Sequence, residues 1–123
     1  MTGSEYQKLA MRTNDGKSTE RLENIVSKEK KDVGSLLMGC LGLAGESGEL
    51  LDLIKKVVFH GKAFDEEHAK KELGDVLWYV AEIAHSFGWS LDEIMQMNVD
   101  KLKARYPEGF SEERSNHRQA GDL

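Results

Sequence analysis

Cysteine and long apolar runs are almost absent from this chain. Cys40 is the only cysteine, so an internal disulfide is impossible, and neither a CxxC pair nor a Cys/His zinc spacing occurs. Together with the lack of an apolar signal peptide, this favours a reducing, cytoplasmic setting. The longest uncharged run, Val33 to Gly45, is far shorter than the roughly 20 residues of a membrane span, so no membrane partner is expected.

Basic residues are also outnumbered. The chain has 17 lysines and arginines against 22 acidic residues, a formal net charge of −5 and a pI of about 5.4. No basic run occurs, so a nucleic-acid polymer is not an expected partner, and a phosphate ligand would need a metal ion or a few well-placed cations. The length suits one domain over residues 1–123, with an N-terminal helix and linker over 1–21 and a polar C-terminal tail over 108–123.

Proline is as scarce as cysteine, with Pro107 alone, and strand-like alternation is nearly missing. We therefore expect an all-α protein. Apolar residues recurring at helical spacing, with suitable ends, predict helices over residues 4–12, 36–60, 66–87 and 91–105. The mixed-charge stretch 20–32 either begins a helix or stays loose, and the tail after Pro107 is expected to be irregular.

Residues suited to helix ends flank these segments. Ser4, Asp65 and Ser90 stand where an N-cap belongs, and Glu93 would complete a capping box with Ser90. The expected C-terminal stops are Gly61 and Gly88.

The stretch GCLGLAGESGELLD, residues 39–52, combines a glycine at every third position with two carboxylates. Glycine weakens a helix by about 0.5–1 kcal/mol per residue, so either another helix packs closely here or space is needed around Glu46 and Glu49. The spacing matches neither a P-loop nor a dinucleotide fingerprint. No lysine or arginine lies between Val33 and Ile54, and unpaired carboxylates on an apolar helix are costly unless a cation is supplied.

A second pair, Glu72 and Asp75, has the same i, i+3 spacing within KELGDVLWYV. Lys71 could pair with Asp75, which would make that acid an ordinary surface residue. If the second and third long helices pack antiparallel, the two pairs converge into a cluster of hard oxygen donors suited to Mg²⁺ or Mn²⁺. The expected metal ligands are Glu46, Glu49, Glu72 and Asp75, and four unrelated surface acids are the alternative.

The two acidic motifs also carry a family resemblance. GESGE, followed after 22 residues by ELGD, resembles the paired ExxE and ExxD motifs of the MazG-like nucleotide pyrophosphohydrolases, the all-α NTP pyrophosphatase superfamily. EYQKLAMRT, IKKVVFHG and NVDKLKARYPEGFSEERSNHR look like the family's opening helix, second-helix exit and C-terminal signature. Many members carry two consecutive glutamates where this chain has Gly45-Glu46, which leaves four acids as candidate ligands.

The resemblance implies an oligomeric four- to five-helix bundle, a homodimer or homotetramer. It also implies hydrolysis of a nucleoside triphosphate to the monophosphate and pyrophosphate, with Mg²⁺ as cofactor and Mn²⁺ as a possible substitute. By resemblance the four acids bind the metal, and Glu49, central among them, is favoured to accept the proton of the attacking water. Two other interpretations remain open: a phosphoribosyl-ATP pyrophosphohydrolase, and a non-catalytic helical interaction module.

Further residues are candidates for binding the nucleotide. Lys56, two turns after Glu49, could reach a distal phosphate or only compensate the helix dipole. Tyr79, one turn after Asp75, could stack on the base or pack in the core. The family pattern NxxKLxxRYP suggests phosphate or sugar contacts, with a solvated face as the alternative, for Asn98, Lys101 and Arg105. The four histidines show no ligand spacing, and the sequence assigns no role to His60, His68, His85 or His117.

Overall fold

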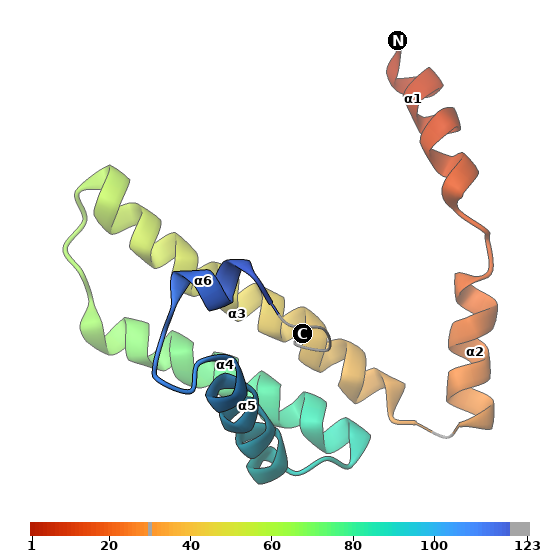
Figure 1. The fold of residues 1–123 in the computed structure, drawn as a ribbon. Helices are drawn as coiled ribbons and strands as arrows, with labels where there is room; N and C mark the ends of the chain where they lie inside the picture. Colours follow the sequence, from red (N-terminus) through yellow and green to blue (C-terminus); the bar gives the residue numbers. More distant parts are fainter. Residues whose placement is uncertain (30, 119–123) are drawn as a thin grey trace.

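The computed structural model describes residues 1–29 and 31–118, and this part of the chain is helical without any strand. The elements are α1 Gly3–Ala10, the short 3-10 helix η1 Met11–Thr13, α2 Ser18–Lys28, α3 Val33–His60, α4 Glu66–Phe87, α5 Leu91–Arg105 and α6 Glu112–Asn116 (Figure 1). The all-α prediction is confirmed. No helix of the described residues is long and apolar enough to cross a membrane.

The ends of the long helices follow local signals in the sequence. Gly61 and Gly88 end α3 and α4 with φ angles of 65° and 72°, a left-handed conformation that favours glycine. The Asp65 side chain accepts a hydrogen bond from the backbone N–H of His68, as expected of the α4 N-cap. Ser90 precedes α5, but its side chain makes no capping hydrogen bond, so the predicted capping box with Glu93 is wrong.

The terminal segments differ more from the prediction. Thr2, rather than Ser4, caps α1, in a reciprocal capping box with Glu5. The stretch that was expected to begin a helix or stay loose contains the separate helix α2. The tail is not wholly irregular, because Ser111 caps the short helix α6. Lys30 and residues 119–123, parts of the predicted 20–32 stretch and polar tail, lie outside the described residues.

A close antiparallel packing of α3 and α4 forms the centre of the molecule (Figure 1). A Cβ added at Gly42 would lie 2.1 Å from the Tyr79 ring, and one added at Gly39 would lie 2.7 Å from the Ile83 side chain. Real Cβ atoms do not approach so closely, so these two positions need glycine. The first of the two explanations for the glycines, close helix packing, therefore holds for Gly39 and Gly42.

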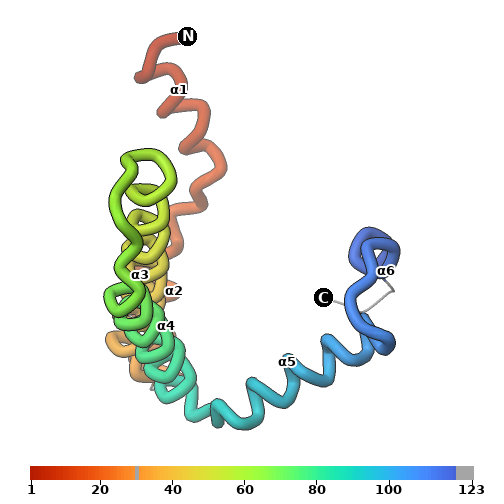
Figure 2. The backbone as a smooth tube through the Cα atoms, turned by 90° about the vertical axis from the view of Figure 1, so that its left-hand side faces the viewer, coloured from red at the N-terminus to blue at the C-terminus, as the bar shows by residue number. Residues whose placement is uncertain are grey.

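The other helices do not close around this hairpin. α1 and α2 extend from one end (Figure 1), and α5 leaves the end of α4 in a different direction and carries α6 away from the hairpin (Figure 2). Of the described apolar residues only Val33 and Ala84 are buried, whereas Leu41 and Leu51 are 73% and 70% exposed. The chain exposes 10198 Å², against roughly 6,600 Å² for a compact monomer of its mass. The single chain is thus open and does not form the closed bundle that the sequence predicted.

Replacing Gly42 with alanine should destabilise the fold by about 1–3 kcal/mol, because the new methyl group collides with the Tyr79 ring. Gly45→Ala is the matched change on the same helix. Its Cβ meets nothing within 4 Å, so it should instead gain about 0.5–1 kcal/mol of helix stability. Urea unfolding of both variants measures the difference, and equal stabilities for the two would contradict the close packing at Gly42.

Candidate metal centre

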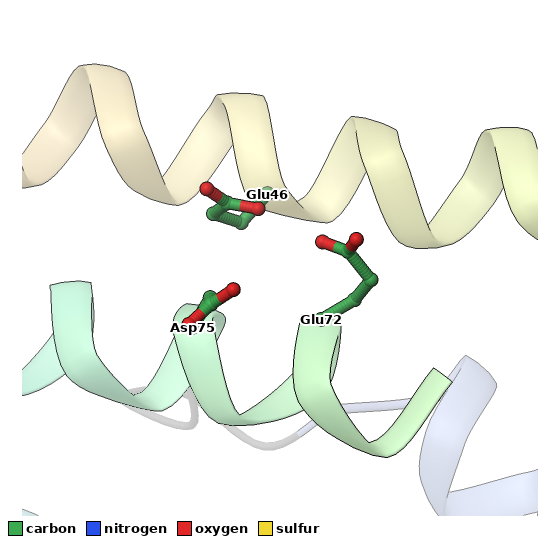
Figure 3. Close-up of side chains that lie close together, drawn as sticks. All are labelled: Glu46, Glu72 and Asp75. Carbon is green, nitrogen blue, oxygen red and sulfur yellow. The ribbon is translucent and has the colours of Figure 1, made fainter. Parts of the chain in front are cut away.

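Three carboxylates face one another across the α3–α4 hairpin. Glu46 projects from α3, while Glu72 and Asp75 project from successive turns of α4 toward it (Figure 3). One oxygen from each of the three lies within 4.8 Å of the others. Glu46 and Glu72 are partly buried between the helices, and Asp75 is exposed. The antiparallel packing expected from the sequence therefore brings acids from both motifs to one place.

The carboxylates of this cluster lie close enough to repel one another, and this changes the pKa of Glu46. The contact with the Glu72 carboxylate raises the pKa of Glu46 above its usual value, and partial burial and the charges of Glu72, Asp75 and Glu49 add to the effect. The nearby lysines of α4 are paired elsewhere. Lys70 lies 2.8 Å from Glu66, and Lys71 lies 2.9 Å from Glu67 rather than near Asp75. The suggestion that Lys71 neutralises Asp75 is therefore wrong.

His68 is a neighbour of the cluster that the sequence analysis missed. Its Nε2 lies 2.7 Å from Oε1 of Glu72, one turn further along α4. The Glu72 side chain is only 14% exposed, so this contact fixes the orientation of a nearly enclosed carboxylate. Hydrogen bonds of this kind orient metal-binding carboxylates in known sites. The i, i+4 spacing of His68 and Glu72 was the signal that could have found it.

Glu49 lies outside the group of three. It lines a small cavity at the loop end of the hairpin, together with Asp52, Lys56 and His68. Lys56 Nζ is 2.8 Å from Asp52, and Lys55 Nζ is 2.9 Å from it. These lysines lower the pKa of Asp52 to about 2, and Asp52 in turn raises the pKa of Lys56. The roles of Glu49 as ligand and base, and of Lys56 as phosphate contact, stay predictions.

The remaining predicted contacts lie apart from the carboxylates. The Tyr79 ring packs over Gly42 and meets Trp78 edge-on, with 5.1 Å between ring centroids. Asn98 and Lys101 line a separate cavity of about 440 Å³ beside Trp89. The Arg105 guanidinium lies 6.0 Å from the Tyr106 ring centroid. The single chain does not bring the three α5 residues to the carboxylates, and their substrate roles stay predictions.

The donor set fits a hard divalent cation. All three converging groups are carboxylates, which Mg²⁺ and Mn²⁺ accept, whereas zinc sites usually include nitrogen or sulfur. A bound cation would also relieve the repulsion that raises the pKa of Glu46. Glu46, Glu72 and Asp75 are therefore the residues that would hold such an ion.

The chain is thus an all-α protein in which three carboxylates, able to hold a divalent metal, converge between two helices. Residues 36–110 match the MazG nucleotide pyrophosphohydrolase domain, and the chain belongs to this family. It is also similar to a protein described as "Gene 37 protein" of Mycobacterium phage L5, with 34% identity over 73 residues. That match covers 56% of this chain and 64% of the phage protein. No solved structure is significantly similar to the chain.

Replacing Glu46 with glutamine should raise the melting temperature of the metal-free protein at neutral pH. Because the folded-state pKa of Glu46 lies above 4.5, its contribution to stability is fully present below pH 4.5 and is lost as pH rises through the raised value. Glutamine cannot lose a proton, so the variant avoids this loss. Melting in EDTA should show a gain near pH 7 that disappears below pH 4.5.

The matched control for this experiment is Glu67→Gln, which removes an exposed charge that pairs with Lys71. It should show no gain at pH 7. A gain as large as that of Glu46→Gln would mean that the effect comes from net charge and not from the cluster.

Proposed function

We propose that the protein is a Mg²⁺-dependent nucleoside triphosphate pyrophosphohydrolase, which converts an NTP or dNTP and water into the monophosphate and pyrophosphate. The bond that breaks joins the α- and β-phosphate groups. Water supplies a hydroxyl group to one fragment and a proton to the other. The observation that supports the proposal best is the convergence of Glu46, Glu72 and Asp75 in a chain of the MazG family.

The chain's own residues have distinct tasks in this proposal. Glu46, Glu72 and Asp75 hold the cation, which neutralises phosphate charge and activates water when bound. His68 keeps Glu72 oriented through its 2.7 Å contact. Glu49, one turn from Glu46 on α3, takes the proton from the attacking water, as the sequence analysis favours.

The substrate is held by groups outside the carboxylate cluster. Lys56 contributes positive charge from the loop end of α3, where Asp52 holds its ammonium group. The aromatic ring of Tyr79 and the polar side chains of α5, Asn98, Lys101 and Arg105, are the proposed contacts to base, sugar or phosphate. Because α5 projects away from the hairpin, its residues would reach a site only in an assembly of several chains (Figure 2).

A panel of nucleotides tests the activity. With Mg²⁺, at least one NTP or dNTP should yield the monophosphate and pyrophosphate in equal amounts, and EDTA should stop the reaction. Glu72→Gln should lower the rate by about 100-fold or more, since loss of a residue that merely supports a ligand costs about 10–100-fold. It should also weaken Mn²⁺ binding measured by electron paramagnetic resonance. Glu67→Gln, an exposed acid of the same helix, should change neither.

Different results would favour the other interpretations. Turnover of phosphoribosyl-ATP alone would indicate the related histidine-synthesis enzyme. Failure to hydrolyse any nucleotide, together with no effect of Mg²⁺ or Mn²⁺ on melting, would favour the non-catalytic interaction module. Parental activity in Glu72→Gln would rule out the carboxylate site.

The proposed active form is a homo-oligomer. The open protomer exposes roughly 3,600 Å² more than a compact chain of its mass. An obligate dimer interface covers about 2,000–5,000 Å² summed over both chains, or about half of that for each. One interface of this size leaves part of the additional exposed surface uncovered, which favours an intertwined dimer or a tetramer. The five most exposed apolar residues of the hairpin are the expected contacts: Leu41, Leu51, Val58, Phe59 and Leu77.

Light scattering at micromolar concentration should give two or four times the chain mass of 13.8 kDa. Replacing Leu51 and Leu77 with aspartate should lower this mass and the helix content together, because each chain lacks a core of its own. A stable, helical parent protein at the monomer mass would contradict the assembly.

A further inference from the structure

The first 28 residues form an arm, made of α1, η1 and α2, that extends from one end of the α3–α4 hairpin (Figure 1). Within the described part of the chain, neither α1 nor α2 packs extensively against the hairpin. The match to the MazG domain begins only at residue 36, after the arm. The arm is therefore separate from the carboxylate cluster, and the single chain leaves its helices without a packing partner.

Helix α2 has an apolar face that needs a surface to pack against. Leu22, Ile25 and Val26 recur at the spacing of one helix face, and all three are exposed. The opposite face is polar and includes Asn24. Helices shorter than about 12–15 residues are only marginally stable alone in water, and α2 has 11 residues. Its stability therefore depends on contacts that the single chain does not supply.

Helix α3 has a matching apolar stripe on the side that faces away from α4. Its members alternate in steps of four and three residues, the spacing at which one helix packs along another. This outer stripe consists of Leu37, Leu41, Ala44, Gly48 and Leu51, all of them exposed. At 100° per residue the stripe lies about half a turn around the helix from Gly42, which contacts Tyr79 of α4. The outer stripe is therefore free to receive a further helix without disturbing the hairpin.

The connection between α2 and α3 directs the arm away from its own outer stripe. Asp32 has φ −75° and ψ 76°, the centre of an inverse γ-turn in which the backbone N–H of Val33 donates to the carbonyl oxygen of Lys31 at 2.9 Å. Val33 is buried, and the Lys31 ammonium group lies 6.0 Å from the ring centroid of Phe87 at the end of α4. These contacts hold the start of α3 against the end of α4. For α2 to fold back onto its own α3, this turn would have to reverse and lose them.

The exposed area favours a second copy of the chain as the partner of the arm. The single chain exposes roughly 3,600 Å² more than a compact chain of its mass, and one obligate interface covers about 1,000–2,500 Å² of each chain. At least roughly 1,100 Å² of the additional exposed surface then needs a further contact. A second copy supplies an outer stripe for this chain's arm and an arm for this chain's outer stripe. A two-fold arrangement covers both surfaces at once and leaves no open end.

We propose that the arm of each chain crosses to a second copy, where Leu22, Ile25 and Val26 of α2 pack on the outer stripe of that copy's α3. The inference rests on the assembly proposed together with the function, and not on the hydrolysis itself. The carboxylates lie on the other side of α3, so the exchanged arms join two chains without covering the cluster.

Photochemical cross-linking of the full chain tests which chain the arm contacts. With p-benzoylphenylalanine in place of Leu22, irradiation should join two chains into a covalent dimer of twice the 13.8 kDa chain mass on a denaturing gel. Mass spectrometry should place the cross-link on a peptide of α3. The same group in place of Asn24, on the polar face of α2, is the matched control and should give at least tenfold less covalent dimer.

Two aspartate variants test whether the contact holds the assembly together. Ile25→Asp and Asn24→Asp add the same charge to opposite faces of α2. In analytical ultracentrifugation, Ile25→Asp should raise the dissociation constant of the assembly at least tenfold, and Asn24→Asp should change it less than twofold. Ile25→Val, which keeps the face apolar, should retain the parental constant.

The results separate this inference from the proposed function. A cross-link within one chain, a covalent dimer joined outside α3, equal yields from positions 22 and 24, or parental assembly of Ile25→Asp would each overturn the exchange of arms. If such a parent protein still hydrolyses nucleotides, the proposed function stands. A covalent dimer joined through α3 in a protein that hydrolyses no nucleotide would support the exchange and contradict the function alone.

Discussion

The close approach of α3 and α4 at Gly42 sets the position of everything else in the site. In the observed register of the two antiparallel helices, the Tyr79 ring lies over this glycine and the Ile83 side chain lies against Gly39, so both positions have room only for glycine. One helical turn beyond this contact, the same register places Glu46 opposite Glu72 and Asp75. The cost of glycine in the middle of a long helix is thus offset by the accuracy with which it aligns the carboxylates.

The alignment also produces a gradient of charge along the hairpin. At its middle, three acids face one another without a lysine or arginine paired to them in the described part of the chain, and they hold the pKa of Glu46 high. At the loop end, Asp52 keeps two lysines in place, and the pKa of Asp52 falls to about 2 in response.

Much of the fold and of the carboxylate cluster could be predicted from local sequence patterns, and the predictions that were wrong or missing have physical reasons. The bounds of α4 match the prediction because Asp65 and Gly88 mark its ends, and the bounds of α5 match although Ser90 makes no capping hydrogen bond. Helix α3 begins three residues before its predicted start, at Val33, because Asp32 caps a turn without apolar periodicity. The i, i+3 spacings correctly indicated that Glu46, Glu72 and Asp75 meet. Three residues rotate about 300° around a helix, so Glu49 sits about 60° away from Glu46 and one turn nearer the loop. His68 was missed because its i, i+4 spacing with Glu72 indicates a contact with the carboxylate cluster only once α3 and α4 are packed.

The open shape of the single chain could not be predicted for a different reason. The sequence pattern of an apolar helix face is the same whether residues of its own chain or of another chain cover that face. The hairpin of α3 and α4 forms from neighbouring segments, but most of its apolar surface is exposed in the single chain. In the proposed assembly, folding and association are one event, with a rate that grows with the concentration of chains. Newly made copies would then be most vulnerable to proteolysis when the protein is scarce, and abundance itself would protect them.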